Sequence, residues 1–244
     1  VPEISFGSMP NDGGYFLFTD EEKVEFLKIE PGASKFIKPI LSNKEFLNGI
    51  KRWCLWLIDI KPNELRELPE IAKRVKLVKD LRASSDREAT KKLAAFPALF
   101  GENRQPKFTF ILIPLHSSEN RRYIPMGFFD KDSIANNSCS TIDNASIYHF
   151  GILQSNMHMT WVRNVCGRIK SDFRYSNEIV YNNYPWPLNP TEKQIKAIEA
   201  CAQQVLDARK EFPDSSLADL YDPTSMPPKL IKAHQELDKA VDAA

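Results

Sequence analysis

The sequence has no apolar run close to the roughly 18 residues that a membrane-spanning helix requires. Its start, Val1–Ser5, has neither an initiator methionine nor the basic and apolar regions of a secretory signal. No CxxC pair occurs among the four cysteines, which argues against a disulfide scaffold and a cysteine-rich zinc site. We therefore expect reduced thiols, a cytoplasmic location, no membrane partner, and a chain that is part of a longer protein.

The glycine-rich motifs that cradle nucleotides or present a nucleophile are also absent. No GxGxxG, GxxxxGK[ST] or GxSxG segment occurs, so a Rossmann site, a P-loop and a hydrolase elbow all lack their glycines. The four histidines stand singly in the sequence, and the side chains of neighbouring residues diverge on a helix. The sequence therefore predicts no catalytic residue, no metal site and no cofactor site within this chain.

What is present is the composition of an ordinary folded protein: 244 residues, 42% hydrophobic and 27% charged, with 33 basic and 32 acidic side chains. The balance of charge hides an asymmetry. Residues 1–184 hold 26 basic and 22 acidic side chains, whereas residues 185–244 hold 7 and 10. A modestly basic body is weak support for an anionic partner, because clustering matters more than the total.

Hydrophobic periodicity predicts an α+β body, with short β-rich runs as strands and apolar residues spaced by three or four as helices. The predicted strands cover residues 52–58, 108–113, 123–129 and 179–181, with short pieces within 138–150. The predicted helices cover residues 20–29, 43–48, 63–93 and 157–166. Pro69 and Ser84–Ser85 divide the third helix, and Gly167 is placed as the C-terminal cap of the fourth.

A proline-rich segment over residues 182–187 breaks this pattern, and we place a domain boundary between Tyr184 and Pro185. Beyond it, the Asn189–Glu192 segment predicts a helix start, with an N-cap followed by proline at the first helical position. Another helix is predicted from Pro227–Pro228. The expected fold class is therefore α+β: a mixed-sheet domain with packed helices over residues 1–184, and a small α-helical domain over 185–244.

Two short motifs favour enzymatic alternatives. Asp59–Ile60–Lys61 follows an apolar strand and matches half of a metal-dependent nuclease pattern, in which Asp-x-Lys holds a divalent ion and a water. The pattern also needs an upstream acidic residue, for which Asp20 or Glu45 is available. Asn183–Trp186 is similar to the Asn-Pro-Pro-aromatic motif of amino-group DNA methyltransferases, but Tyr184 replaces the first proline. A solvated turn and a rigid linker are the simpler interpretations.

Basic and aromatic residues cluster on three predicted loops. These loops cover residues 104–107, 117–123 and 167–176. Arginine, lysine, serine and asparagine on loops carried by a rigid sheet suit phosphate contacts and base-edge readout in duplex DNA. Three such clusters in a chain without catalytic motifs favour binding of double-stranded DNA. A domain that contacts only protein is the third alternative.

Several longer segments resemble the C-terminal part of the MmeI-like family. The similar segments are residues 6–14, 52–57, 100–106, 148–151, 167–176 and 180–187. Members of this family are bacterial enzymes that fuse a DNA adenine methyltransferase to a target-recognition domain, often with a nuclease at the N-terminus. The similarity extends over nearly the whole chain.

The resemblance implies that residues 1–184 form a target-recognition domain and residues 185–244 part of the helical C-terminal domain. It implies a parent restriction–modification enzyme that transfers a methyl group from S-adenosylmethionine to N6 of a flipped adenine. The fragment itself would be non-catalytic and without cofactor. Its partners would be duplex DNA and the methyltransferase domain of the same parent chain.

Basic residues on the predicted loops are the expected phosphate contacts. They are Arg121, Arg122, Arg168, Lys170 and Arg174. An alternative for Arg168 and Arg174 is an internal ion pair with Asp172.

Base edges are the expected targets of Arg104, Gln105 and the segment 131–137. Within that segment, Lys131 and Asn136 offer donors in the major groove. Asp132, or Asp130 just before the segment, offers an acceptor for a cytosine amine.

Overall fold

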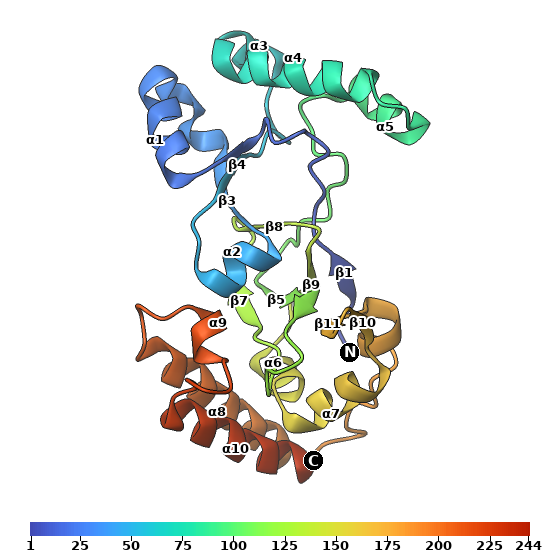
Figure 1. The fold of residues 1–244 in the computed structure, drawn as a ribbon, viewed down its shortest axis with the longest axis vertical. Helices are drawn as coiled ribbons and strands as arrows, with labels where there is room; N and C mark the ends of the chain where they lie inside the picture. Colours follow the sequence, from blue (N-terminus) through green and yellow to red (C-terminus); the bar gives the residue numbers. More distant parts are fainter.

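The computed structural model describes all 244 residues and shows an elongated molecule with two lobes joined by a narrower waist (Figure 1). The chain has no helix that combines the length and the apolar character needed to cross a membrane. Strands and helices both contribute to each lobe, so the α+β prediction is confirmed.

The upper lobe is built on a small sheet in the order β2–β4–β3–β8. These strands are β2 (Leu17–Phe18), β4 (Trp53–Leu55), β3 (Ile37–Leu41) and β8 (Ile134–Ala135). The lobe's helices are α1 (Asp20–Ile29), α3 (Pro62–Arg66), α4 (Pro69–Ala83) and α5 (Glu88–Lys92), with 3₁₀ turns at Pro31–Phe36 and Leu93–Ala95. The predicted breaks at Pro69 and Ser84–Ser85 are confirmed, because α4 begins and ends there.

Helix α4 brings one arginine into the interior of the upper lobe. Arg82 is 1% exposed, and its guanidinium donates five hydrogen bonds to backbone carbonyl oxygens at 2.8–3.2 Å. The acceptors belong to Pro10, Asn11, Leu93, Phe96 and Leu99. All five N–H groups of the fork are therefore used, and one side chain holds two irregular segments against α4.

The lower lobe is built on an antiparallel sheet in the order β1–β9–β5–β7. These strands are β1 (Ile4–Phe6), β9 (Cys139–Asp143), β5 (Phe110–Pro114) and β7 (Gly127–Phe129). Alternate residues of β5 face opposite sides: Ile111 and Ile113 join the core below the sheet, whereas Phe110 and Leu112 pack with α2 (Asn43–Asn48) above it. Burial on both faces explains the continuous apolar run of this strand.

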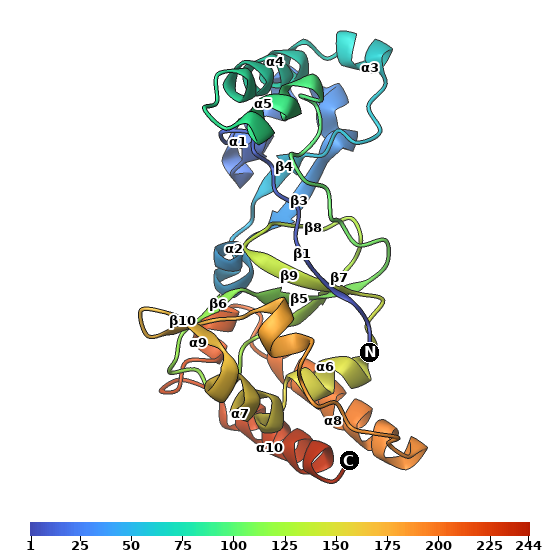
Figure 2. The same ribbon diagram turned by 90° about the vertical axis from the view of Figure 1, so that its right-hand side faces the viewer.

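The C-terminal helices complete the core of the lower lobe (Figures 1 and 2). They are α6 (Ile147–Leu153), α7 (Asn156–Val165), α8 (Glu192–Lys210), α9 (Leu217–Leu220) and α10 (Pro228–Asp242). A single cluster of 29 buried residues runs from Ile4 in β1 to Val241 in α10. A Cβ added at Gly151 would lie 2.7 Å from Ile198, so α6 and α8 approach too closely for any larger residue.

A buried polar network fastens these helices to the body. The ring nitrogens of His234 bond to the Tyr221 hydroxyl at 2.8 Å and the Gln154 carbonyl at 3.1 Å. Arg209 donates to the Met126 carbonyl at 2.6 Å. The Tyr123 ring stacks on His234 with centroids 3.9 Å apart. The network therefore joins α8, α9 and α10 to the segment that leads into β7.

Burial keeps two histidines neutral, and stability should depend on pH as a result. Desolvation lowers the pKa of His158 from 6.5 to about 4 and that of His234 well below its ordinary value. Because the unfolded chain then binds more protons than the folded chain, the free energy of unfolding falls as pH falls below the ordinary histidine pKa.

We expect a loss of about 2 kcal/mol for each of these histidines between pH 7 and pH 5. Urea unfolding at the two pH values measures it. A His158→Gln variant should be less stable at pH 7 but show a shallower pH dependence. An equal slope in this variant would contradict the assignment to His158.

Several predicted elements were wrong. Residues 147–153 form α6 rather than a strand piece, because Ser146 and His149 make a capping box. Asn177–Tyr181 is a π-helical turn rather than a strand, and the Ser176 side chain caps it by accepting from the Ile179 backbone N–H. Only Gly127–Phe129 of the predicted strand 123–129 pairs with a neighbour, although Tyr123–Met126 is buried.

Two predicted helix ends and one predicted loop were also wrong. Cys166, in an extended conformation, ends α7, and Gly167 begins strand β10 instead of acting as the cap. Helix α8 is capped by Thr191 through a capping box with Gln194, since Asn189 has a left-handed backbone conformation with φ 55°. The predicted loop 167–176 is largely a β-hairpin.

Candidate nucleic-acid interface

The segment 131–137, here called the waist loop, lies between the lobes and includes β8. The side-chain amide of Gln105 holds its path. Its nitrogen donates to the carbonyl oxygens of Lys131 at 3.1 Å and Ser133 at 2.7 Å, and its oxygen accepts from the Ala135 N–H at 3.0 Å. The side-chain amide of Gln105, predicted from the sequence to contact a base edge, is thus already hydrogen-bonded to backbone groups of the waist loop.

The N-terminal segment holds the waist loop from the other side. The Ser8 N–H donates to the Ala135 carbonyl at 2.7 Å, and the Asn137 N–H donates to the Ser8 carbonyl at 2.9 Å. A Cβ placed on Gly7 would lie 2.3 Å from the Asn136 carbonyl oxygen. Only glycine permits the two backbones to approach so closely, which explains why residue 7 is a glycine.

The acidic residues next to the waist loop are already engaged. One oxygen of Asp130 accepts from the backbone N–H groups of Asp132 and Ser133, at 2.9 and 3.0 Å. Asp132 pairs with Lys38 of β3 at 2.8 Å, and this hydrogen bond lowers its pKa. Lys131 is exposed, and its side chain makes no ion pair or hydrogen bond, so it is the free cation of the loop.

Arg104 leads into the same region but is partly engaged. Its guanidinium pairs with Glu102 and lies 6.0 Å from the exposed ring of Phe6, while its backbone N–H donates to the Ser8 hydroxyl at 3.0 Å. Asn136 is half-buried, and its side-chain oxygen accepts from the Ser138 N–H at 3.0 Å. The four base-edge candidates, Arg104, Gln105, Lys131 and Asn136, therefore gather at the waist.

Three of the phosphate candidates, Arg168, Lys170 and Arg174, lie on a separate three-stranded sheet in the order β10–β11–β6. Strands β10 (Gly167–Ile169) and β11 (Asp172–Arg174) form the hairpin, and β11 pairs with β6 (His116–Ser117). The hairpin turn projects from the side of the lower lobe in Figure 2. Lys170 lies in this turn with φ 55°, exposed and without a carboxylate partner.

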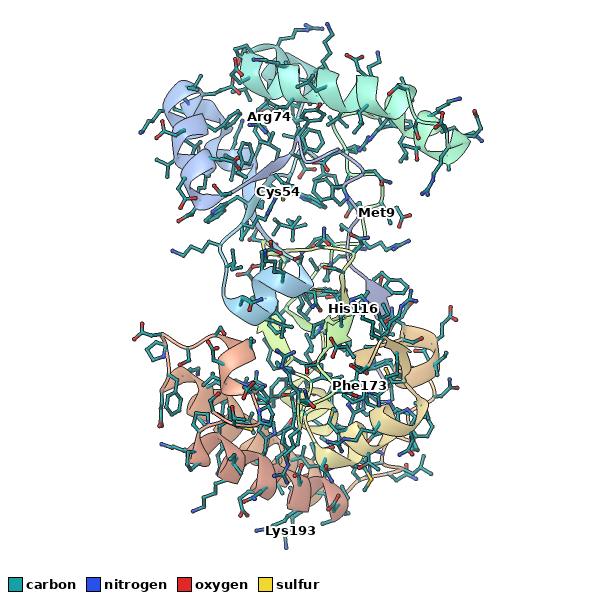
Figure 3. All side chains as sticks on the ribbon, in the orientation of Figure 1. Met9, Cys54, Arg74, His116, Phe173 and Lys193 are labelled. Atoms are coloured by element: carbon teal, nitrogen blue, oxygen red, sulfur yellow. The ribbon has the colours of Figure 1, made fainter.

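The strand register separates the hairpin arginines onto two faces. Arg168 pairs with Phe173 and stacks on its ring at 4.0 Å, and it donates to the Ser171 carbonyl at 2.8 Å. Arg174 lies on the opposite face, paired with His116 of β6. It is exposed and makes no ion pair or side-chain hydrogen bond. Figure 3 labels Phe173 and His116 on these neighbouring strands.

The internal ion pair with Asp172 is absent. Arg168 lies 3.9 Å from Glu119 instead, and one Asp172 oxygen accepts from the Glu119 backbone N–H at 3.2 Å. Asp172 thus holds the neighbouring loop rather than an arginine of the hairpin. Arg174 keeps its full charge available to an outside anion.

Comparison with known proteins gives the family. Residues 1–188 match the MmeI target recognition domain, and residues 190–244 match the MmeI C-terminal domain. The chain belongs to the MmeI family. A similar protein, DNA methyltransferase A of Bacillus subtilis strain 168, is 41% identical over the whole chain, which covers 28% of that relative.

A solved structure has the same fold as this MmeI-family chain. It is the type IIL restriction-modification enzyme MmeI in complex with DNA, with a TM-score of 0.97 and 46% identity. The match covers all of this chain and 32% of that one. The chain therefore spans less than a third of the length of both relatives.

In this MmeI-family chain the remaining phosphate candidates follow β6. Arg121 is half-buried and donates to the Ser117 hydroxyl at 3.3 Å, while burial lowers its pKa and its Nε has no partner. Arg122 is exposed, with its guanidinium 5.6 Å from the Tyr123 ring. Arg122 is thus accessible to an anion but also interacts with Tyr123 and Asp238, whereas Arg121 is partly used by the loop that carries it.

The two motifs that favoured enzymatic alternatives do not lie in the surroundings that catalysis would require. Asp59 and Lys61 are exposed in a turn between β4 and α3, and no group of three His, Cys, Asp or Glu side chains could hold a metal there or elsewhere in the chain. Asn183 donates to the Glu178 carbonyl at 2.7 Å, and Tyr184 is buried in the core of the lower lobe. The nuclease alternative is not favoured by the family match.

Sequence reasoning missed the residue that connects the two clusters. Asn43, the first residue of α2, donates its N–H to the Ser138 hydroxyl at 2.9 Å and accepts from the His116 N–H at 3.2 Å. It thereby fixes the end of the waist loop relative to β6. No signal in the sequence identified it beyond its place at a helix start.

Proposed function

We propose that this chain is a target-recognition module that binds double-stranded DNA and selects a short sequence in it. The observation that carries the proposal is the match of the whole chain, at a TM-score of 0.97, to an MmeI structure that contains DNA. The free cations of the hairpin and the waist loop provide the chemistry that such binding needs.

The hairpin supplies the contacts to the DNA backbone in this proposal. Arg174 is exposed and unpaired, so neutralising a phosphate requires it to give up no internal partner. Arg122 is exposed as well, but it also interacts with Tyr123 and Asp238. Arg168 and Arg121 contact phosphates from positions fixed by Phe173 and Ser117. Since a two-stranded ribbon fits the major groove, Lys170 in the turn reaches furthest and is also placed for a base edge.

The waist loop supplies the base readout in this proposal. Lys131 offers a donor, with Arg104 as the second cation of the region. Gln105 acts by holding the loop, since its amide makes three backbone hydrogen bonds. Asp132 is available to a cytosine amine only when its ion pair with Lys38 opens.

The parent protein is proposed to be a site-specific adenine-N6 DNA methyltransferase of a restriction–modification system, located in the cytoplasm. Residues 1–184 select the site, and residues 185–244 support them through the shared core. The glycine pair Gly13–Gly14 leads into the two-residue strand β2 and not into a helix, so it does not form a nucleotide-binding turn. The proposal assigns catalysis and the binding of S-adenosylmethionine to the methyltransferase domain of the parent.

The test is duplex binding by wild-type protein and by Arg174→Ala. Loss of one phosphate contact should weaken binding to all sequences about fivefold to tenfold and reduce the slope of log affinity against log salt by about 1. Lys193→Ala is the matched control, since Lys193 lies exposed at the far end of the lower lobe (Figure 3). Equal binding by all three proteins would contradict the role of Arg174.

Selection from a random duplex library at low salt tests the module itself. An enriched asymmetric motif is the expected result. Failure to retain any duplex would contradict the proposal and favour the protein-interaction alternative.

A further inference from the structure

Two adjoining hollows open at the waist beside the waist loop. One has a volume of about 340 Å³ and the other about 180 Å³, and both are lined by Ile40, Glu45 and Arg52. The smaller one is completed by Leu17, Ser42 and Asn136. None of these features is used by the contacts assigned above, apart from the position of Asn136 in the waist loop.

The smaller hollow contains a buried carboxylate with a free oxygen. The Glu45 side chain is only 7% exposed. Its Oε2 accepts from the Ser42 hydroxyl at the start of α2, and its Oε1 accepts no hydrogen bond and lies 3.8 Å from Arg52. Oε1 therefore has only the Arg52 guanidinium nearby and can accept a hydrogen bond from a group that enters the hollow.

Two donors line the same hollow. Arg52 makes no side-chain hydrogen bond, and its guanidinium has only the long contact with Glu45. Asn136 uses its side-chain oxygen on the Ser138 N–H, which leaves its NH₂ group unengaged. Leu17 and Ile40 add apolar walls. The hollow thus offers one acceptor, two donors and apolar surface for a flat ring.

We propose that this hollow receives an extrahelical thymine. The Watson–Crick edge of thymine presents two carbonyl oxygens on either side of one N–H, which matches two donors and one acceptor. Cytosine has an acceptor at the ring nitrogen where thymine has an N–H. This nitrogen and the Glu45 oxygen are both acceptors, so no hydrogen bond would form between them. Guanine presents two donors and one acceptor on this edge, so Arg52 or Asn136 would be left without an acceptor.

The inference rests on the proposed function. A methyltransferase that flips an adenine leaves the thymine of that base pair without a partner. A pocket for this thymine stabilises the opened duplex and reports that the extruded base was adenine. The waist loop would then read neighbouring bases while Asn136 contacts the unpaired one.

The experiment compares duplexes that are identical except for one bulged nucleotide: dT, dC or an abasic residue, with a perfect duplex as reference. Wild-type protein should bind the dT bulge about tenfold more tightly than the abasic bulge, as one well-formed set of base contacts requires. The dC bulge should resemble the abasic one. Fluorescence anisotropy measures all four affinities.

Two variants remove the match without removing the local fold. In Glu45→Gln, the amide oxygen still accepts from Ser42, and the NH₂ group faces the N–H of thymine. In Asn136→Asp, the oxygen that accepts from Ser138 is kept and the donor is lost. Both should lose the preference for dT, and Glu67→Gln, on an exposed residue of the upper lobe, should keep it.

The outcomes separate the two proposals. Equal binding of the dT and abasic bulges by wild-type protein overturns the thymine pocket, while binding of the perfect duplex still supports DNA recognition. Retained dT preference in both folded variants also overturns it, because the preference then comes from elsewhere. Failure to bind any duplex overturns both proposals.

Discussion

Replacement of Gly7 by alanine is expected to break the junction between the N-terminal segment and the waist loop. The new methyl group would lie 2.3 Å from the Asn136 carbonyl oxygen and 2.7 Å from that of Ala135. Both obstacles are backbone atoms, so no side chain can rotate away. We expect a loss of about 2 kcal/mol or more in the free energy of unfolding, measured in urea.

The same substitution should reduce sequence selectivity more than non-specific affinity. The hydrogen bonds from Ser8 and Asn137 that cross this junction hold the candidate readout segment, whereas the hairpin cations lie elsewhere. Gly167→Ala is the matched control, because its added Cβ has its nearest neighbour at 3.9 Å. Wild-type stability and selectivity in Gly7→Ala would contradict this prediction, because the two backbones could then move apart without loss.

Replacement of Arg82 by lysine should destabilise the upper lobe by about 3 kcal/mol or more. Lysine keeps the charge but cannot reach five carbonyl oxygens. The carbonyls of Asn11 and Leu99 would lose their hydrogen bonds inside the protein, and those of Pro10, Leu93 and Phe96 would keep only a backbone donor. Arg87→Lys, on an exposed residue at the start of α5, should change stability by less than about 0.5 kcal/mol.

Tryptophan fluorescence can locate the effect of the Arg82 substitution. Trp53 and Trp56 belong to the upper lobe, whereas Trp161 and Trp186 pack against the lower core. A variant that keeps only one of these two tryptophan pairs has fluorescence that reports the unfolding of one lobe. If Trp53 and Trp56 report the same free energy of unfolding for Arg82→Lys as for wild type, the role of the guanidinium is contradicted.

The sequence allowed the long helices and the buried central strand to be predicted, because these elements repeat an apolar pattern over several turns. Helix α4, with Ile71, Val75 and Val78 buried, and β5 are examples. The hairpin was missed since its strands have three residues each and carry polar side chains. The turn Asn177–Tyr181 was missed because Val180 and Tyr181 are buried by tertiary contacts rather than by sheet pairing, while Ile179 is exposed.

The candidate site, too, was predicted only in the part that depends on local sequence. Composition located the basic clusters, but not which cations are free. Arg168 stacks on Phe173, and Gln105 reaches a loop 26 to 30 positions further along the chain. Such partners depend on the fold, so a residue list from the sequence could not separate positioning residues from exposed ones.

The waist loop is held mainly through its main-chain atoms, since Gln105, Ser8, Leu41 and Asp130 all bind its backbone. The side chains of Asp132, Ser133 and Asn136 each add one hydrogen bond. The exposed Lys131 and the half-buried Asn137 contribute no side-chain hydrogen bond to that arrangement. Their identities are therefore interchangeable as far as folding is concerned. In the proposed readout role, this arrangement separates the fold from the sequence preference: a substitution at Lys131 would change the donor presented to DNA and leave the hydrogen bonds that hold the loop unchanged.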